Sequence, residues 1–387
     1  MRVLFINTVF GKGSTGRIVQ DIGEVLEKKG HEYIALYGRP PISCDPHAVF
    51  IGGSLDAKIH AGLSRITDKS GFYSVNATKK AIAFIREYQP DVIHMHNLHG
   101  YYINLELLFS FLRTEYHGKV IWTLHDCWAF TGHCVHYTYA KCVKWKTQCD
   151  HCPEKKRYPA SLLLDNSKKN YIRKKNILTG VPNMTIVTPS QWLADQVGES
   201  FLKGYPCRVI NNGIDLQIFA PQKVQVERPF VLNIMDGLDE RKGFSDLVEI
   251  SKQISDLYDF VIIGLNKDEM DKIPKNIRAI SRTSSQKELA RYYTRANFLV
   301  NTTYEDTFPT VSIEALACGT TVITYRSGGS PEIIDENSGY VVEPGDLQAV
   351  ISLIRHDCRK STQACRARAA CFDKWDKYGE YIALYLG

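Results

Sequence analysis

A chain of 387 residues is too long for one ordinary hydrophobic core, and its composition of 44% hydrophobic and 23% charged residues excludes a disordered or fibrous protein. The net charge of +6 permits anionic partners without requiring nucleic acid. No apolar run approaches the roughly 18 residues of a membrane span. The first residues lack the architecture of a signal peptide, so we expect a cytoplasmic protein with reduced thiols, despite eleven cysteines.

Short apolar segments alternate with helical stretches along nearly the whole chain. This alternation is typical of parallel sheets covered on both faces by helices. A polar, turn-rich segment over 211–229 interrupts it, so we predict two doubly wound α/β domains with their boundary there. The predicted strands are 2–6, 32–37, 91–96, 119–125, 185–190 and 207–213 in the first domain, and 230–235, 258–264, 277–281, 297–302, 321–325 and 339–343 in the second.

The first predicted strand is followed by Gly11, Gly13 and Gly16, which have the G-x-G-x-x-G spacing of dinucleotide-binding proteins. Two features argue against that ligand. Four residues separate the strand from Gly11, and the second strand leads to Arg39 where an acid would hold a ribose. The loop also lacks the Lys-Ser/Thr pair that a P-loop has after its last glycine. We therefore expect a glycine loop, with close backbone approach to a ligand, leading into a helix over 17–29.

Polar side chains follow several predicted strands, where open parallel sheets bind their ligands. His94, His96 and His99 follow one strand, and His125 and Asp126 follow the next. This spacing at the end of a strand is weak evidence for metal ligands, so we expect no metal site there.

Four cysteines lie in an irregular segment after the fourth predicted strand, and their C-x7-C-x6-C-x2-C spacing suits a structural, tetrahedral zinc ion. Unligated thiols, or a disulfide formed on oxidation, are the alternatives. Such a four-thiolate site has no open position, so we expect no catalytic role for it. The proposed ligands are Cys134, Cys142, Cys149 and Cys152.

The most specific segment is 304–334, in which Asp306 is followed after seven residues by Glu314, at the opening of an apolar helix that ends at Gly319. This spacing places one carboxylate on a loop and another on the helix face that looks back at it. The segment resembles the E-x7-E motif of the family 4 glycosyltransferases, enzymes of GT-B fold with two facing Rossmann-like domains and a cleft between them. The resemblance covers essentially the whole chain, and it continues in 124–134, 187–197, 209–219 and 240–244.

The resemblance implies retaining transfer of a sugar from a nucleotide diphosphate sugar, without a catalytic metal or other cofactor. It implies that Glu314 binds the ribose hydroxyls and that Arg241 and Lys242 hold the diphosphate. Asp306 stands where the family usually has a glutamate near the transferred sugar, and Glu305 adjoins it, so either acid is a candidate for the sugar contact. The donor-binding residues also include Thr307 and Phe308.

Members of the family often carry an arginine six residues before the lysine, and this chain has Asp236 there. An acid would repel a diphosphate, so we expect Asp236 to point elsewhere.

In the first domain the resemblance places His125 against the donor sugar. Asp126 is predicted either to fix the tautomer of that histidine or to meet the acceptor. Gly13 and Gly16 are predicted to face the diphosphate. The resemblance further implies an acceptor-binding domain over 1–212 with a cysteine-rich insertion at about 127–160, a nucleotide-sugar domain over 213–370, and a helix over 371–387 that crosses back to the first domain.

These features predict a hexosyltransferase of bacterial surface polysaccharide biosynthesis, such as capsule, exopolysaccharide or O-antigen. It would move a sugar from a UDP- or GDP-sugar to a saccharide carried on undecaprenyl diphosphate. Residues 155–175 carry eight basic side chains and one acid, which predicts peripheral docking on the anionic inner leaflet of the cytoplasmic membrane. A sugar-nucleotide 2-epimerase of the same fold is one alternative. A zinc-stabilised nucleic-acid-binding protein is another, although we expect no nucleic acid as partner.

Overall fold

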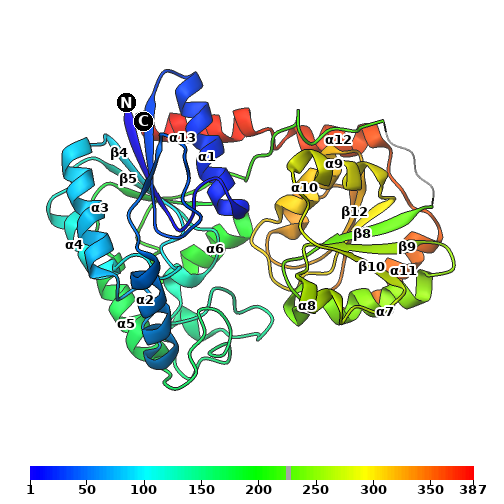
Figure 1. Cartoon of the computed structure of the whole chain (residues 1–387), viewed down its shortest axis with the longest axis horizontal. Helices are drawn as coiled ribbons and strands as arrows, with labels where there is room; N and C mark the ends of the chain where they lie inside the picture. The colour runs from blue at the N-terminus through cyan, green and yellow to red at the C-terminus, as the bar shows by residue number, and fades with distance from the viewer. Residues whose placement is uncertain (224–227) are drawn as a thin grey trace. The chain divides into compact units, whose positions relative to one another are not determined.

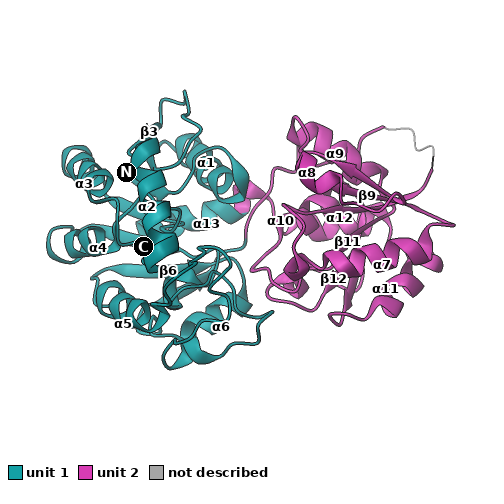
Figure 2. Cartoon of the chain, turned by 60° about the horizontal axis from the view of Figure 1, so that its bottom comes forward, with its two compact units in different colours: residues 1–211, 377–387 teal, residues 212–376 magenta. Residues whose placement is uncertain are grey.

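The computed structural model describes residues 1–223 and 228–387, which form two compact units (Figure 1). Unit 1 comprises residues 1–211 and 377–387, and unit 2 comprises residues 212–376 (Figure 2). Each unit is built around one sheet of parallel strands. The division lies one residue from the predicted boundary at 212, and the C-terminal return to unit 1 begins at 377 rather than 371.

The sheet of unit 1 has the strand order β3-β2-β1-β4-β5-β6-β7. Chain order therefore runs outward in both directions from β1 and β4, which is the doubly wound pattern. The strands are β1 Arg2–Asn7, β2 Glu32–Tyr37, β3 Ala48–Phe50, β4 Val92–Met95, β5 Lys119–Thr123, β6 Met184–Thr188 and β7 Cys207–Val209. All were predicted except β3, a three-residue edge strand that is too short to show an alternating pattern.

The first helix of unit 1 begins at Gly13, so the prediction that it starts at residue 17 was wrong. Gly16 is buried within the helix, where a Cβ would stand 3.1 Å from Val9 Cγ2, and its carbonyl accepts a hydrogen bond from Gly11 N at 3.0 Å. The helices are α1 Gly13–Lys28, α2 Ser54–Thr67, α3 Val75–Tyr88, α4 Leu105–Thr114, α5 Ser167–Leu178, α6 Gln191–Glu199 and α13 Lys374–Leu386, of which α13 joins unit 1 from residue 377.

Unit 2 has a six-stranded sheet with the order β10-β9-β8-β11-β12-β13. Its strands are β8 Phe230–Ile234, β9 Asp259–Ile263, β10 Ile277–Ile280, β11 Phe298–Asn301, β12 Thr321–Tyr325 and β13 Gly339–Val342. Its helices are α7 Phe244–Ile254, α8 Lys267–Met270, α9 Gln286–Arg295, α10 Thr310–Ala317, α11 Leu347–Arg355 and α12 Thr362–Ala370.

Alternating side chains of the unit 2 strands enter two separate cores. Leu232 and Leu299 pack on one face of the sheet, and Val231 and Val300 pack on the other. Both cores are apolar because helices cover both faces, which explains why the strands read as continuous hydrophobic runs. Each fully buried aliphatic side chain contributes about 1.5–3 kcal/mol to folding.

The C-terminal helix α13 is fixed to unit 1 by polar contacts. His94 lies in β4 and is fully buried, with Nδ1 at 2.5 Å from Tyr385 Oη and Nε2 at 2.7 Å from Thr123 Oγ1. Lys119 Nζ donates to the carbonyls of Leu384 and Tyr385, at the end of the helix. Both nitrogens of His94 therefore have partners within the packed interior.

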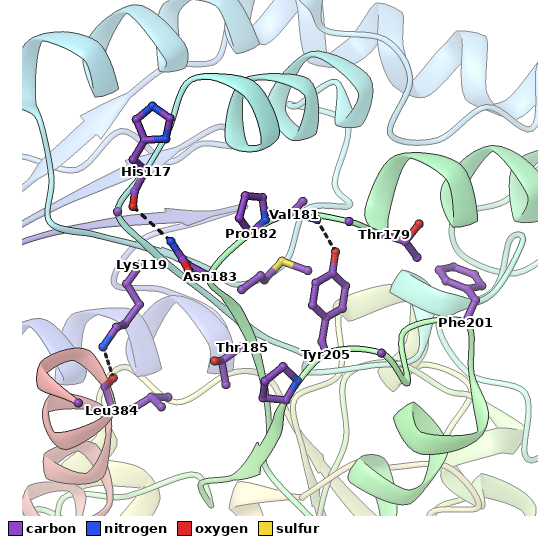
Figure 3. A pocket seen from close by; sticks show the side chains of 16 residues that line it. His117, Lys119, Thr179, Val181, Pro182, Asn183, Thr185, Phe201, Tyr205 and Leu384 are labelled. Carbon is purple, nitrogen blue, oxygen red and sulfur yellow. Dashed lines mark hydrogen bonds between the residues drawn. The ribbon is translucent and has the colours of Figure 1, made fainter.

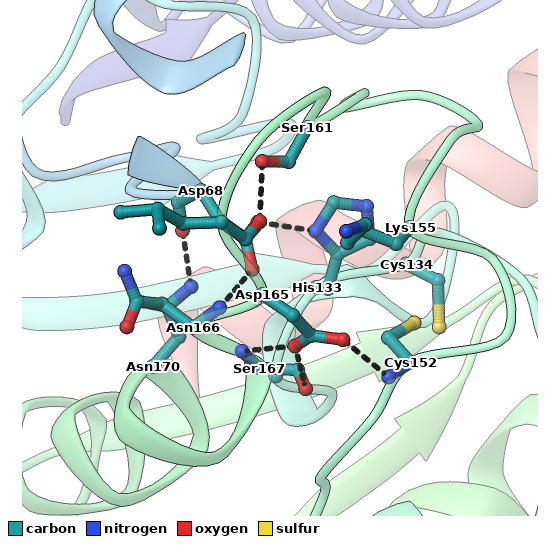
Figure 4. Close-up of polar contacts among 12 residues, drawn as sticks. Asp68, His133, Cys134, Cys152, Lys155, Ser161, Asp165, Asn166, Ser167 and Asn170 are labelled. Atoms are coloured by element: carbon teal, nitrogen blue, oxygen red, sulfur yellow. Dashed lines mark hydrogen bonds and ion pairs between the residues drawn. The ribbon is translucent and has the colours of Figure 1, made fainter. Parts of the chain in front are cut away.

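The cysteine-rich insertion after β5 has little regular structure beyond two short 3-10 turns, Trp128–Phe130 and Lys144–Lys146. It is held by a buried ion pair between His133 of the insertion and Asp68, which ends α2 in a left-handed conformation (Figure 4). Asp68 also accepts from Asn166 N at 2.8 Å and, through its carbonyl, from Asn170 Nδ2. One residue thus joins α2, the insertion and α5.

Among the described residues, no helix combines the length and the hydropathy that crossing a bilayer requires.

The Asp68–His133 pair makes stability depend on pH. Burial lowers the pKa of His133, but the hydrogen bond and the negative charge of Asp68 outweigh burial, and the net effect raises it. A raised folded-state pKa stabilises the protein fully below the unfolded pKa of about 6.5, and this contribution disappears as pH rises through the folded-state value. We expect Asp68→Asn to lower the free energy of unfolding by about 2 kcal/mol near pH 6 and by less near pH 9. Urea denaturation at both pH values measures the difference, and an equal loss at both would contradict the assignment.

Candidate active site

Two loops of unit 2 meet at one edge of its sheet. Strands β8 and β11 are parallel neighbours, so the segments that follow them leave the same edge. The 3-10 turn Glu240–Lys242 follows β8, and residues 302–309 follow β11. Tyr304 N donates to Arg241 O at 2.7 Å. Gly243, with φ +72°, lies so close to the second loop that a Cβ would stand 2.3 Å from Thr302 O. The loops are therefore fixed against each other through their backbones.

The two cations predicted to hold a diphosphate are both bound by acids. Lys242 Nζ contacts Asp306 Oδ2 at 3.0 Å and Glu305 O at 3.2 Å. Arg241 Nη2 donates to Asp239 Oδ2 at 2.6 Å, and its Nη1 lies 3.6 Å from Glu305 Oε2. The Glu305 side chain is buried, whereas Asp306 is one quarter exposed. The structure thus separates the two adjacent acids, since Glu305 faces Arg241 and Asp306 faces Lys242.

The carboxylate of Glu314 is oriented by a second helix. Glu314 lies in α10, is buried, and accepts a hydrogen bond at 2.8 Å from the hydroxyl of Tyr293 in α9. Glu314 is the fifth residue of α10 rather than its opening residue. Sequence analysis missed Tyr293. It lies twenty-one residues before Glu314, and nothing in its helical pattern indicates that it donates a hydrogen bond to this acid.

The other predicted residues of this segment are packed into unit 2. Thr307 and Phe308 are buried, and the Phe308 ring packs on Phe372 with centroids 5.7 Å apart. Asp306 Oδ1 accepts from Phe308 N at 3.2 Å. Phe308 therefore fixes the loop by its ring. Asp236 is exposed and pairs with Arg282 at 2.8 Å.

In unit 1, the ends of two adjacent strands bring a pair of histidines together. β4 and β5 are parallel neighbours, and His96 and His125 follow them at the same edge. Their rings stack at an interplanar angle of 13°, and His96 Nδ1 lies 3.0 Å from His125 Nε2. His96 is buried, and its Nε2 has no hydrogen-bond partner among residues 1–223 and 228–387. The pairing of these two strands in the predicted sheet is the signal that could have found His96.

Burial keeps both rings neutral. It lowers the pKa of His96 well below the usual value, and the neighbouring histidines lower it further. For His125, burial lowers the pKa to about 4 although Asp126 raises it. Between two neutral imidazoles, the N–H of one ring can donate a hydrogen bond to the bare nitrogen of the other, whereas two charged rings would repel each other.

Asp126 is placed differently from the prediction that it fixes the His125 tautomer. Its Oδ2 accepts from His99 Nε2 at 2.7 Å, and its Oδ1 accepts from Trp128 N at 2.8 Å. His99 Nδ1 lies 2.9 Å from the hydroxyl of Tyr158. Burial raises the pKa of Asp126, but His99 outweighs burial and the pKa lies at about 2. The carboxylate therefore anchors His99 and the start of the insertion.

The glycines predicted to face a diphosphate differ in setting. Gly13 is exposed, with φ +66° and open space where a Cβ would lie. Gly16 is buried and serves the close packing described above. Of the two, only Gly13 offers accessible backbone.

Metal binding finds no support in the geometry. Within residues 1–223 and 228–387, no three His, Cys, Asp or Glu side chains form a group that could hold a metal ion. Cys134 and Cys152 share a hydrogen bond, which raises the pKa of the Cys134 thiol and lowers that of Cys152. The structural zinc ion at Cys134, Cys142, Cys149 and Cys152 stays a prediction.

Two side chains of the basic run 155–175 are engaged within unit 1, and the predicted docking of the run on a membrane stays a prediction. Lys174 is buried, and its Nζ donates to Trp128 O at 2.7 Å and lies 3.5 Å from the centre of the Trp128 ring. Arg173 pairs with Glu106 at 2.5 Å. These two charges hold the insertion and α4 in place.

A cavity of about 890 Å³ opens at the opposite edge of the unit 1 sheet (Figure 3). Lys119, which begins β5, lines it together with Asn183, Tyr205 and Leu384. None of the predicted site residues lines this cavity, so it is separate from the histidine pair beyond the end of β5.

Two doubly wound units of this topology, with a chain that returns to the first, define the GT-B class of glycosyltransferases. Residues 15–218 match the model of Glycosyltransferase Family 4, and residues 230–356 match that of Glycosyl transferases group 1. The chain belongs to Glycosyltransferase Family 4, as the sequence motifs indicated, and is an enzyme of that kind.

Known proteins are similar along the full length. WcaC of Escherichia coli K12, named as a putative colanic acid biosynthesis glycosyl transferase, is 24% identical over 91% of this chain and 90% of its own. Among solved structures, a sucrose-phosphate synthase of Thermosynechococcus elongatus has a TM-score of 0.72 at 19% identity, with 99% of this chain and 98% of that one covered. Anabaena HepE in complex with UDP-glucose has a TM-score of 0.67 at 14% identity, with 99% of each chain covered.

The lowered pKa of His125 leads to a direct test. We expect its imidazole to stay neutral from about pH 5.5 to 8, where an ordinary histidine gains its proton. The imidazole NMR resonances, assigned by comparison with His125→Asn, should therefore hardly move over this range. A titration midpoint near 6.5 in the folded protein would contradict the buried, neutral pair.

Proposed function

We propose that the protein is a retaining glycosyltransferase that uses a UDP- or GDP-sugar and no catalytic metal. The observation that carries the proposal is the buried Glu314 carboxylate, which accepts a hydrogen bond from Tyr293. The same unit contains Lys242, whose ammonium group is paired with Asp306. A buried carboxylate suits the hydroxyls of a ribose, because its oxygens accept hydrogen bonds. Family membership and the likeness to a structure solved with UDP-glucose support a nucleotide-sugar donor.

The cations would stabilise the departing diphosphate. In the step that we propose, the bond between C1 of the sugar and the β-phosphate oxygen breaks, and a bond from C1 to the acceptor oxygen forms on the same face. The β-phosphate oxygen takes the acceptor proton. Lys242 and Arg241 would balance the developing negative charge, and because acids already orient both side chains, little reorganisation is needed.

Asp306 is the acid that we assign to the donor sugar. It is the more exposed of the two candidates and is fixed by Lys242 and by Phe308 N. Glu305 is buried beside Arg241, so it orients that cation instead. His125 would present a neutral imidazole to the sugar, with its Nε2 occupied by His96.

The acceptor that we propose is a saccharide on undecaprenyl diphosphate in bacterial surface polysaccharide assembly, such as a capsule or exopolysaccharide. Similarity to a protein named for colanic acid biosynthesis over nine tenths of both chains supports this class of product. Such an acceptor lies in the cytoplasmic leaflet, so we also propose a cytoplasmic enzyme that associates peripherally with that membrane.

Nucleotide binding tests the donor site directly. A ligand that binds only the native state stabilises it by about 2.7 kcal/mol at a concentration one hundred times its Kd. We expect UDP or GDP, but not both equally, to raise the melting temperature of the wild type, and Glu314→Gln to reduce the shift strongly.

Asp236→Asn is the matched control, because it removes an exposed acid of the same unit and should leave the shift unchanged. A full shift in Glu314→Gln would contradict the role of this carboxylate. No shift with any nucleoside diphosphate would contradict the donor site.

A further inference from the structure

Helix α2 exposes its large apolar side chains, whereas a helix that only packs on its own unit would bury them. The residues that it buries are small or polar, namely Ala57, His60, Ala61 and Ser64. His60 is satisfied internally, with Nδ1 at 2.7 Å from Ser74 Oγ. The opposite face carries a stripe of exposed residues, Leu55, Ile59, Leu63 and Ile66. At 3.6 residues per turn these four side chains fall within an arc of about 80°.

A second exposed apolar segment continues this stripe. Leu162 N donates to Arg65 O at 2.7 Å, and Leu164 N donates to Ile66 O at 3.2 Å, so residues 162–164 cap the end of α2. Ser161 Oγ closes the turn by donating a hydrogen bond to Leu164 O at 2.7 Å. All seven apolar residues of the stripe and the loop are between 38% and 69% exposed. We call them together the leucine surface.

Cations flank the leucine surface. Lys58 and Arg65 are exposed on α2, to one side of the stripe. Lys155 Nζ lies 3.4 Å from Leu163 O, and Lys168 and Lys169 are exposed in the first turn of α5, just after the loop. The acids nearest in sequence are Asp56 and Asp165, and Asp165 is engaged by Cys152 N and Ser167 N. Positive charge therefore predominates around an apolar face.

We infer that the leucine surface inserts into the outer part of an anionic lipid leaflet. An apolar helix face with flanking lysine and arginine is the arrangement by which helices lie in a membrane interface, with apolar side chains below the headgroups and cations among the phosphates. Single exposed leucines are ordinary, but a contiguous patch of this kind on a globular unit marks an interaction site.

The charge pattern favours lipid over a second copy of the chain. A symmetric dimer through this surface would bring the same patch of both copies together, and with it Lys58 and Arg65 of each. Those like charges would repel across the interface, whereas anionic headgroups neutralise them. The inference rests on the proposed function in one respect, since a lipid-linked acceptor explains why the enzyme would dock. It moves the docking surface from the basic run to α2 and residues 162–164.

Co-sedimentation of the full chain with vesicles tests the inference. We expect binding to vesicles of phosphatidylglycerol and phosphatidylcholine and little binding to phosphatidylcholine alone. Ile59→Asp and Leu163→Asp should each weaken binding about tenfold or more, because each puts a charge in place of an inserted side chain. Lys168→Glu with Lys169→Glu should weaken it mainly at low salt.

Leu257→Asp, at an exposed leucine of unit 2, is the matched control and should bind vesicles like the wild type. All substitutions are at exposed positions, and unchanged melting temperatures will show that the variants fold. Wild-type protein that stays in the supernatant would overturn the inference, as would Ile59→Asp and Leu163→Asp variants that bind normally. A dimer in solution that these two variants dissociate would assign the surface to a second copy instead.

The UDP- or GDP-induced stabilisation of the same variants separates this inference from the proposed function. A nucleotide shift that persists while vesicle binding is lost means that the leucine surface docks the enzyme and the donor site is independent of it. Vesicle binding without any nucleotide shift would leave the leucine surface in place and remove the proposed donor site.

Discussion

In each unit, parallel strands that end at the same edge of the sheet are the constraint that brings the candidate site residues together. In unit 2, β8 and β11 are neighbours, so the turn with Lys242 and the loop with Asp306 meet although sixty-four residues separate them. In unit 1, β4 and β5 bring His96 to His125 in the same way. Because each strand is buried on both faces by helices, the ends of the strands are the places where polar side chains can gather.

The two groups of polar residues follow opposite electrostatic rules. In unit 2, Arg241 is paired with Asp239 and Glu305, and Lys242 is paired with Asp306, so both cations are held in place by carboxylates. In unit 1, the histidines carry no charge, since burial lowers the pKa of His96 and His125. Charged side chains are thus concentrated in the unit 2 group, whereas the stacked pair of histidines in unit 1 is neutral.

The sequence was sufficient for those features that depend on local pattern. Short apolar runs located twelve of the thirteen strands in the described residues, and the E-x7-E spacing located Asp306 and Glu314. Contacts between distant segments could not be predicted: Tyr293 on Glu314, His99 in place of His125 on Asp126, and the burial of Lys174 beneath Trp128. The exposed stripe of α2 was missed for a related reason, because an amphipathic pattern shows that a helix has an apolar face but not which face it buries.

The most direct test of the central claim is the configuration of the product. The full chain would be incubated with a UDP- or GDP-sugar labelled with ¹³C at C1 and an undecaprenyl-diphosphate-linked saccharide, with EDTA present, and the new linkage examined by NMR. We expect a glycosidic bond with the same anomeric configuration as the donor, one nucleoside diphosphate released per sugar transferred, and loss of both in Glu314→Gln. An inverted linkage, a requirement for divalent metal, or an epimerised sugar nucleotide formed without acceptor would contradict it.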